Sequence, residues 1–218
     1  MSWVKKVGYF VNLIALLFLS VNAHAASYDN DIANIQKEWA IAKYKTPRNK
    51  QNMAFDKLIQ EAKILDEHYP HQPRILTWYG TILSSYAQIK GGLKVLPDVK
   101  KARVLLEEAI QLDPNVENGF AQGVLGTLYA RVPSWPIAFG NKKKARLHLE
   151  TAVQINPNSV DTNYYLGDFL VDVGEYEHAR HYLEKAQHTQ TRPTYEIQDR
   201  GRKGEIAASL TKLHRLGH

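Results

Sequence analysis

The chain has 218 residues, 44% hydrophobic and 23% charged, which is the composition of an ordinary globular protein with one domain or slightly more. It contains 0 cysteines, and this excludes thiol catalysis, disulfide frameworks and cysteine-based zinc sites. Nucleic-acid binding needs a basic stripe interleaved with stacking aromatics, and we do not expect it from a modest net charge of +6 and no recognisable motif.

The first 25 residues are typical of a secretory signal peptide. Lys5 and Lys6 precede a mostly apolar run over residues 7–19, and Ala23 and Ala25 supply the small residues of a cleavage site. The run is short for a membrane span of about 20 residues, so an uncleaved anchor is the less favoured alternative. Cleavage after Ala25 would leave 26 basic and 22 acidic side chains, a net charge of +4. We expect export to the periplasm in a Gram-negative source, or secretion otherwise, with membrane contact only through the signal segment.

Two helices are predicted next, over Asp31–Tyr44 and Asn52–Tyr69. Apolar residues recur at helical spacing in both segments. The candidates for burial are Trp39, Phe55, Ile59 and Ala62.

An octet of the form Ala-Arg-x-x-Leu-Glu-x-Ala then occurs three times, at Ala102–Ala109, Ala145–Ala152 and Ala179–Ala186. Its Ala, Leu and Ala fall on one side of a helix, which predicts a small-large-small packing stripe. Its Arg and Glu stand four residues apart on another face, where they support the helix as an ion pair. Three copies in matching surroundings indicate an internal repeat.

Each octet is expected to lie on a helix that pairs with a preceding helix. Proline follows the first Ala of two octets by 12 residues, at Pro114 and Pro157, where it ends one helix and permits the next. The preceding helices carry a large residue followed by Gly80, Gly126 or Gly167, and glycine lets two helices approach closely.

These features resemble the tetratricopeptide repeat (TPR) family, whose first helix carries large-Gly and whose second carries Ala, a large apolar residue, Ala and Pro. The resemblance implies an all-α superhelix of antiparallel helix pairs with a concave, ligand-facing groove, and a role in protein interaction. It divides residues 27–218 into a degenerate unit 31–70, units 73–114, 118–157 and 160–191, and a capping helix 198–216. Such arrays need a cap over the last apolar face, and Ile206, Leu210 and Leu213 supply the apolar residues for it.

Two insertions depart from the family spacing. Gly167 and Ala179 are 12 residues apart, whereas the equivalent spacings in the two earlier units are 22 and 19 residues. The additional segments read KGGLKVLPDVKK and RVPSWPIAFGNKKK, and their Gly and Pro content predicts structured loops rather than continued helix.

The edge formed by these insertions is one candidate binding surface, because loops on a rigid array often carry function. Trp135 and Phe139 either contribute to a pocket or partner site, or fold back as local core. Basic residues follow at predicted helix starts, namely Lys100, Lys101, Lys142, Lys143 and Lys144. They oppose the helix dipole and are predicted to form a positive edge for an acidic partner or anionic ligand, unless they are only a solvated basic face.

The concave groove is the second candidate surface. The TPR resemblance implies that its lining includes Thr77, Thr81, Gly123, Thr127, Tyr164, Asp168 and Asp172. Asp168 and Asp172 stand four residues apart like an acid/base pair, but no His, Ser or third acid follows at a recognisable spacing. No catalytic residue is therefore predicted, and the chain is not expected to be an enzyme.

The histidines raise the question of a metal site. His178 and His181 are three residues apart, His188 follows two turns later, and His68 and His71 flank a helix end. Imidazoles at such spacing can share zinc or copper. No acidic or cysteine ligand completes a coordination shell, so neither a metal nor a cofactor is predicted.

The phrases LGTLYARVP, WPIAFGN and KKARLHLETA are similar to the T components that accompany tripartite solute transporters in bacteria. Those components are usually lipid-anchored, whereas this chain has 0 cysteines to carry a lipid. The sequence thus predicts an exported helical scaffold that binds an unidentified protein partner in the envelope, with an accessory ligand-binding component of a solute-transport system as the alternative. Its oligomeric state does not follow from the sequence.

Overall fold

The structure is a computed structural model, and it describes residues 27–217. A first helix covers residues 27–44, and the helices that follow are α2 (Arg48–His68), α3 (Pro73–Lys90), α4 (Leu96–Leu112), α5 (Phe120–Arg131), α6 (Lys142–Ile155), α7 (Val160–Val173), α8 (Tyr176–His188) and α9 (Glu196–Arg215). The all-α fold is therefore confirmed in this part of the chain. None of the helices described is long and apolar enough to cross a membrane. The predicted signal segment, residues 1–25, lies outside the described residues.

The three octets form the buried seams between paired helices. They lie on α4, α6 and α8, which pack against α3, α5 and α7 respectively. The first Ala, the Leu and the last Ala of every octet are 0% exposed, so the predicted packing stripe is confirmed. The Arg and Glu of the octets form the expected ion pairs, with N–O distances of 3.7, 3.4 and 3.7 Å.

Glycine sets the spacing within each helix pair. A Cβ atom on Gly80, Gly126 or Gly167 would lie 2.8, 2.6 or 2.8 Å from the Cγ atom of the octet leucine that faces it. Because carbon atoms do not approach so closely, any side chain here would force the two helices apart. The glycine and the octet leucine therefore form one packing unit that recurs in each pair.

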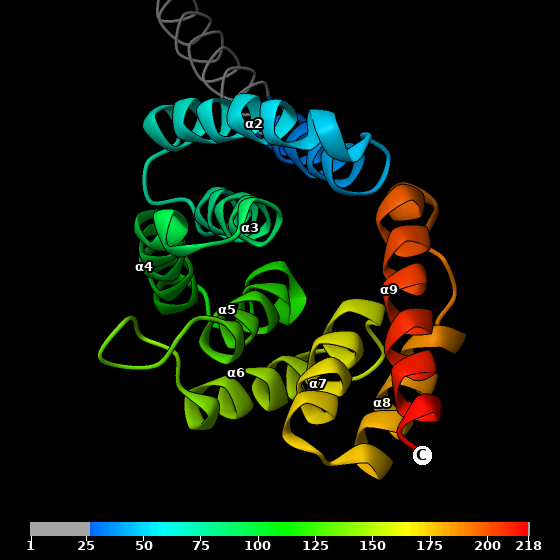
Figure 1. Ribbon diagram of the computed structural model, residues 1–218. Helices are drawn as coiled ribbons and strands as arrows, with labels where there is room; N and C mark the ends of the chain where they lie inside the picture. Colours follow the sequence, from blue (N-terminus) through cyan, green and yellow to red (C-terminus); the bar gives the residue numbers. More distant parts are fainter. Residues whose placement is uncertain (1–26, 218) are drawn as a thin grey trace, which may run out of the picture.

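The helix pairs curve into a ring (Figure 1), with α3, α5 and α7 on its inner side and α4, α6 and α8 outside. The last helix, α9, returns to the first helix and closes the ring. Here the Tyr44 ring lies on Gly201, where a Cβ atom would be 2.2 Å from the ring, and the Tyr44 hydroxyl donates to Glu205 at 3.2 Å. The predicted capping helix thus covers the array and also joins its two ends.

The ends of the array otherwise follow the sequence pattern. Trp39, Phe55 and Ala62 are at most 1% exposed, whereas Ile59 is only partly buried against the core. On α9, Ile206 and Leu213 are 0% exposed.

The first insertion was wrongly predicted to be entirely loop. Only Gly91 and Gly92, with a 3-10 turn over Leu93–Val95, separate α3 from α4, and the remainder of the insertion is the start of α4. Pro97 lies in the first turn of that helix, where its missing N–H would have no helical partner anyway, so proline here begins a helix rather than breaking one. Lys100 and Lys101 therefore lie beyond the first turn of α4, and the expectation that they stand at a helix start is wrong. The second insertion does form a loop, residues 132–141, and α6 begins at Lys142.

Candidate functional site

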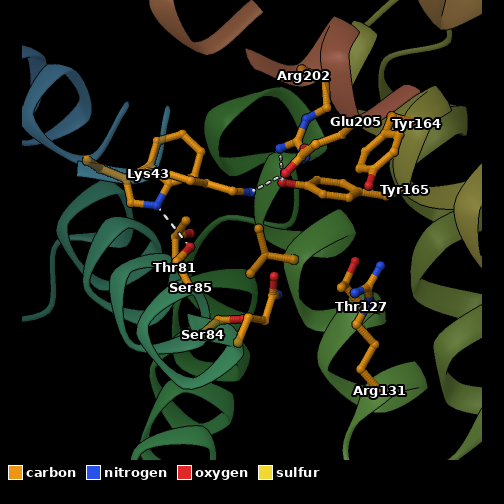
Figure 2. Close-up of a pocket in the computed structure, with 13 residues that line it drawn as sticks. Lys43, Thr81, Ser84, Ser85, Thr127, Arg131, Tyr164, Tyr165, Arg202 and Glu205 are labelled. Carbon is orange, nitrogen blue, oxygen red and sulfur yellow. Dashed lines mark hydrogen bonds and ion pairs between the residues drawn. The ribbon is translucent and has the colours of Figure 1, made fainter. Parts of the chain in front are cut away.

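A polar pocket opens on the inner side of the ring, with a volume of about 70 Å³. A water molecule needs about 10 to 15 Å³ of such volume, so a small polar group fits inside. Five helices supply the lining, which consists of Trp39 and Lys43 from the first helix, Thr81, Ser84, Ser85 and Gln88 from α3, Val124, Thr127 and Arg131 from α5, Tyr164 and Tyr165 from α7, and Arg202 and Glu205 from α9. We call this set the inner pocket (Figure 2).

Arg202 organises the deepest wall of the inner pocket, although it is only 1% exposed. Its guanidinium donates to Asp161 at 2.8 Å and to the Tyr165 hydroxyl at 2.7 Å, and it pairs with Glu205. The guanidinium also lies 4.7 Å from the Tyr164 ring centroid and 4.6 Å from that of Tyr165. A buried charge is tolerated when it is paired and hydrogen-bonded in this way.

Lys43 and Glu205 complete the charged side of the inner pocket. The Lys43 ammonium lies 3.1 Å from Glu205, and Figure 2 shows the two side chains pointing toward each other. Burial and the nearby Arg202 lower the pKa of Lys43 to about 8. Burial alone would raise the pKa of Glu205, but Arg202 and Lys43 outweigh it and keep that pKa below its usual value. Both groups are therefore charged at neutral pH.

Hydroxyl groups line the opposite side of the inner pocket. Ser85 accepts a 2.9 Å hydrogen bond from the indole N–H of the buried Trp39, which fixes the ring beside the pocket. Thr81 and Thr127 each donate to the backbone carbonyl four residues earlier, at 2.8 and 3.0 Å, and their oxygens remain able to accept. The pocket therefore combines cations, a carboxylate and several hydroxyls, which suits a solute with oxygen-containing groups.

A larger, more apolar cavity of about 550 Å³ adjoins the inner pocket and shares Ser84, Gln88, Thr127 and Arg131 with it. We call it the outer vestibule. Its remaining walls come largely from the two insertions and their flanking helices, with the apolar residues Leu93, Val95, Leu96, Val99, Leu128 and Val132 among them. Both insertions therefore meet at this cavity, and the two chambers together offer a polar end and an apolar end.

The residues predicted to line the groove are divided among the inner pocket, the outer vestibule and the packing between helices. Thr81, Thr127 and Tyr164 line the inner pocket, and Asp172 lines the outer vestibule. Asp168 accepts a 2.9 Å hydrogen bond from Ser209 and pairs with Arg131, while Asp172 lies 3.1 Å from the Lys212 ammonium, so both carboxylates are engaged in ion pairs. These two acids thus serve the junction between α7, α5 and α9.

Two of the residues that the TPR resemblance implied for the groove lie in the core instead. Thr77 is 0% exposed and donates to the Pro73 carbonyl, so it faces no groove. A Cβ atom on Gly123 would lie 2.6 Å from the Tyr165 ring, so this glycine accommodates an aromatic ring rather than a ligand.

The loop between α5 and α6 divides its aromatic residues between core and solvent. Phe139 packs edge-on against Tyr129, with centroids 5.6 Å apart, as the local-core alternative predicted. Trp135 is 86% exposed, so that alternative is wrong for it. Lys143 is exposed at the start of α6, and Lys144 lies 5.2 Å from the Tyr129 ring centroid.

The histidines are distributed over separate local contacts. His178 lies 3.6 Å from Glu175, and the His188 imidazole contacts the Glu184 carbonyl at 2.7 Å. Over residues 27–217, no group of three or more His, Asp or Glu side chains is arranged to hold a metal ion.

Sequence reasoning missed the residues that define the inner pocket most strongly, namely Lys43, Arg131, Tyr165, Arg202 and Glu205. One available signal was a polar stripe on the predicted capping helix, where Gln198, Arg202, Glu205 and Ser209 recur at helical spacing beside the apolar residues. That stripe is the face of α9 that turns toward the inside of the ring.

Comparison with known proteins gives the fold class from solved structures and the family from sequence. In the solved structures, a thermophilic TPR protein of Thermus thermophilus superposes with a TM-score of 0.54 at 16% identity, covering 89% of this chain and 97% of that one. MamA gives a TM-score of 0.33 at 17% identity over 72% of this chain and 95% of its own. The first likeness defines the fold class as a TPR-type helical repeat.

A sequence model of the TRAP transporter T-component family matches residues 40–198, which is most of the chain. The chain therefore belongs to that family, and the local similarity noted in its sequence is confirmed. A search of curated proteins finds no match.

Proposed function

We propose that the protein is an exported accessory component of a tripartite solute-transport system, which holds a small solute inside its helical ring while it acts as a scaffold for a partner protein. The observation that carries the proposal is the inner pocket, where polar side chains from five helices converge in a member of the T-component family. A convergent polar pocket beside an apolar cavity is the usual form of a small-molecule site. No catalytic step is part of the proposal.

The chemistry of the two chambers favours an amphipathic solute. The hydroxyls of the inner pocket suit a carboxylate or hydroxyl group, and the apolar walls of the outer vestibule suit a hydrocarbon portion. Lys43 and Arg131 are already paired with Glu205 and Asp168, so they add hydrogen-bond donors to the site rather than an uncompensated positive charge. Ser84, which is 3% exposed, lines both chambers, and we propose that a molecule spanning them passes beside it.

Export is proposed from the signal-like segment at residues 1–25, which precedes the described part of the chain. A periplasmic location would place the ring where a transported solute is captured. Amino-terminal sequencing of the exported protein tests this part directly, because cleavage after Ala25 leaves Ala26 as the first residue.

The solute-binding role is tested by native mass spectrometry of the purified protein and by thermal shift with small carboxylates of increasing chain length. We expect a retained or added small molecule that raises Tm. Ser84→Leu fills the passage between the chambers and should abolish this effect, whereas Ser84→Ala leaves the space open and should retain it. A wild-type protein that retains no small molecule and shows no thermal shift with any of these carboxylates would argue against the pocket as a solute site and leave only the scaffold role.

A further inference from the structure

We propose that the groove between α4 and the loop over residues 132–141 binds an acidic segment of a partner protein that carries an apolar anchor side chain. The inference rests on the proposed scaffold role and names the surface that performs it. The groove lies away from the inner pocket, on the outer side of the array, and has a volume of about 500 Å³. We call it the loop groove.

The loop that forms one wall is held firmly at its base. The backbone N–H of Gly140 donates to Pro133 at 2.9 Å, and that of Asn141 donates to Tyr129 at 2.8 Å. The Asn141 side chain then caps α6 by accepting from the Lys144 N–H at 3.0 Å. Figure 1 shows this loop standing out from the ring beside α4 and α6. A rigid base presents the apex in one position, which reduces the entropy lost on binding.

Both walls of the loop groove expose apolar side chains to solvent. Ile137 on the loop is 56% exposed and Val104 on α4 is 53% exposed. Trp135 does not line the groove, but it is 86% exposed and directly precedes the lining residue Pro136. Phe139 forms the floor between the two walls, where the Arg103 guanidinium lies 4.6 Å from its ring centroid. An apolar side chain inserted between Ile137 and Val104 would cover both walls, and the loop and α4 also carry Trp and Arg, which are enriched in protein-binding hot spots.

The positive charge of the loop groove favours a negatively charged partner segment. Its lining includes Lys100, Lys101 and Arg103, and no carboxylate. Within residues 27–217 no acidic side chain lies within ion-pair distance of Lys100 or Lys101, although Lys101 donates to the Tyr79 hydroxyl at 2.6 Å. Arg103 pairs with Glu107 at 3.7 Å, whereas Lys100 and Lys101 are open to ion pairs with Asp or Glu residues of the partner.

The same observations disfavour two other occupants. A second copy of this chain is also positive, with a net charge of +4 after the proposed cleavage, and would be repelled by a basic groove. A lipid bilayer is flat, whereas the apolar side chains of the loop groove line a concave surface between two walls, which fits a chain segment better.

The test uses a short fluorescein-labelled peptide rich in Asp and Glu, with Leu and Phe at its centre. Binding is followed by fluorescence anisotropy, and contact at the groove by protection of Trp135 from acrylamide quenching, with Trp135→Phe as the blank. Trp39 and Trp78 are 1% and 2% exposed, so Trp135 dominates the quenchable signal of the described residues. We expect the peptide to bind and protect Trp135, a Ser-substituted acidic peptide to bind about tenfold more weakly, and a Lys-rich analogue not to bind.

Two double variants with the same change in charge locate the site. Lys100→Glu with Lys101→Glu should weaken the Leu-Phe peptide at least about tenfold, whereas Lys50→Glu with Lys57→Glu, on exposed positions of α2, should change it less than about twofold. Val104→Ser keeps the charges of the groove and should still weaken peptide binding. It therefore tests the groove even if the Lys100 and Lys101 double variant fails to fold. Circular dichroism checks that all three variants are folded. Equal losses in both double variants, or an unprotected Trp135, would overturn the proposal, as would equal protection by phosphatidylglycerol vesicles. Solute binding in the inner pocket is measured separately, by native mass spectrometry and thermal shift. The solute-binding proposal and the loop-groove proposal can therefore fail independently.

Discussion

The inner face of the ring and the loop groove differ in whether their charged side chains are paired within the chain. Inside, Arg202 and Lys43 pair with Asp161 and Glu205, so charges from the first helix, α7 and α9 neutralise one another. Outside, the cations of the loop groove face no carboxylate in its lining. Burial explains the difference, because a charge removed from water needs a partner supplied by the fold, whereas an exposed cation remains hydrated until a ligand arrives. Ring closure and partner binding should therefore respond to different mutations.

The largest expected effect is at Arg202. Arg202→Met removes the guanidinium that Asp161, Glu205 and Tyr165 share. The two carboxylates lose their common partner and keep only Arg192 and Lys43, respectively, as cations within ion-pair distance among the described residues. We expect the free energy of unfolding to fall by about 3 to 5 kcal/mol in urea titration. Arg200→Met is the control, because Arg200 is exposed on the same helix and pairs with the exposed Glu196. This variant should stay within about 0.5 kcal/mol of wild type. Equal losses in the two variants would mean that the inner network contributes nothing specific.

Two glycines of α9 test the closure of the ring. Gly201→Ala places a methyl group against the Tyr44 ring and should destabilise the protein by about 1 to 3 kcal/mol, measured by thermal unfolding. Gly204→Ala meets no atom within 4 Å and should raise stability by up to about 1 kcal/mol through helix propensity alone. Adding Tyr44→Ala to Gly201→Ala should recover the packing part of the loss. If both glycine variants gain stability, the first and last helices do not meet as described.

The pH dependence of stability isolates Lys43. Because burial lowers its pKa to about 8 from 10.5, the folded chain releases this proton over a range in which the unfolded chain keeps it. The free energy of unfolding therefore rises with pH from about 8 toward 10.5, by less than about 1.4 kcal/mol per pH unit from this group. Comparing wild type with Lys43→Met up to about pH 9, one unit below the ordinary tyrosine pKa of about 10, should show this rise only in wild type. Parallel curves would contradict a buried ammonium.

The smallest effect is expected at the loop apex. Trp135→Ser should change the free energy of unfolding by no more than about 0.5 kcal/mol, because the side chain is 86% exposed. Phe139→Ala, four residues later, should lower it by about 1 to 2 kcal/mol, since that ring packs on Tyr129. Urea titrations of both variants make the comparison. A large loss at Trp135 would show that the apex serves the fold and not a partner.

Much of the fold could be predicted because repeated local patterns carry it. The stripe of Ala102, Leu106 and Ala109, its two copies, and the glycines that face them follow from helical periodicity and side-chain size. The first insertion was predicted less well, since Pro97 lies in the first turn of α4, whereas the Gly and Pro content of this segment had indicated a loop. Proline permits either outcome, and only its place relative to the first turn decides between them.

The candidate site was predicted in part. Tyr164, Thr81 and Thr127 were placed in the groove correctly through the family resemblance, but Arg202 was passed over as part of a cap. A charged residue on a terminal helix is normally solvated, and here it is buried because α9 packs across the open end of the ring. Likewise, Phe139 is partly buried because its ring packs against Tyr129, whereas Trp135 is exposed to solvent. The sequence does not show which of the two rings makes that contact.

The amino-acid sequence by itself determined the helices, their pairing and the spacing between paired helices, because these depend on contacts among residues close in the chain. Only the tertiary structure decided which charges are buried, which pockets form and which aromatic side chain reaches solvent. Those properties depend on the curvature of the ring, which brings Lys43 and Glu205 from opposite ends of the chain to within 3.1 Å. Curvature accumulates over every helix pair, and no short stretch of sequence encodes it.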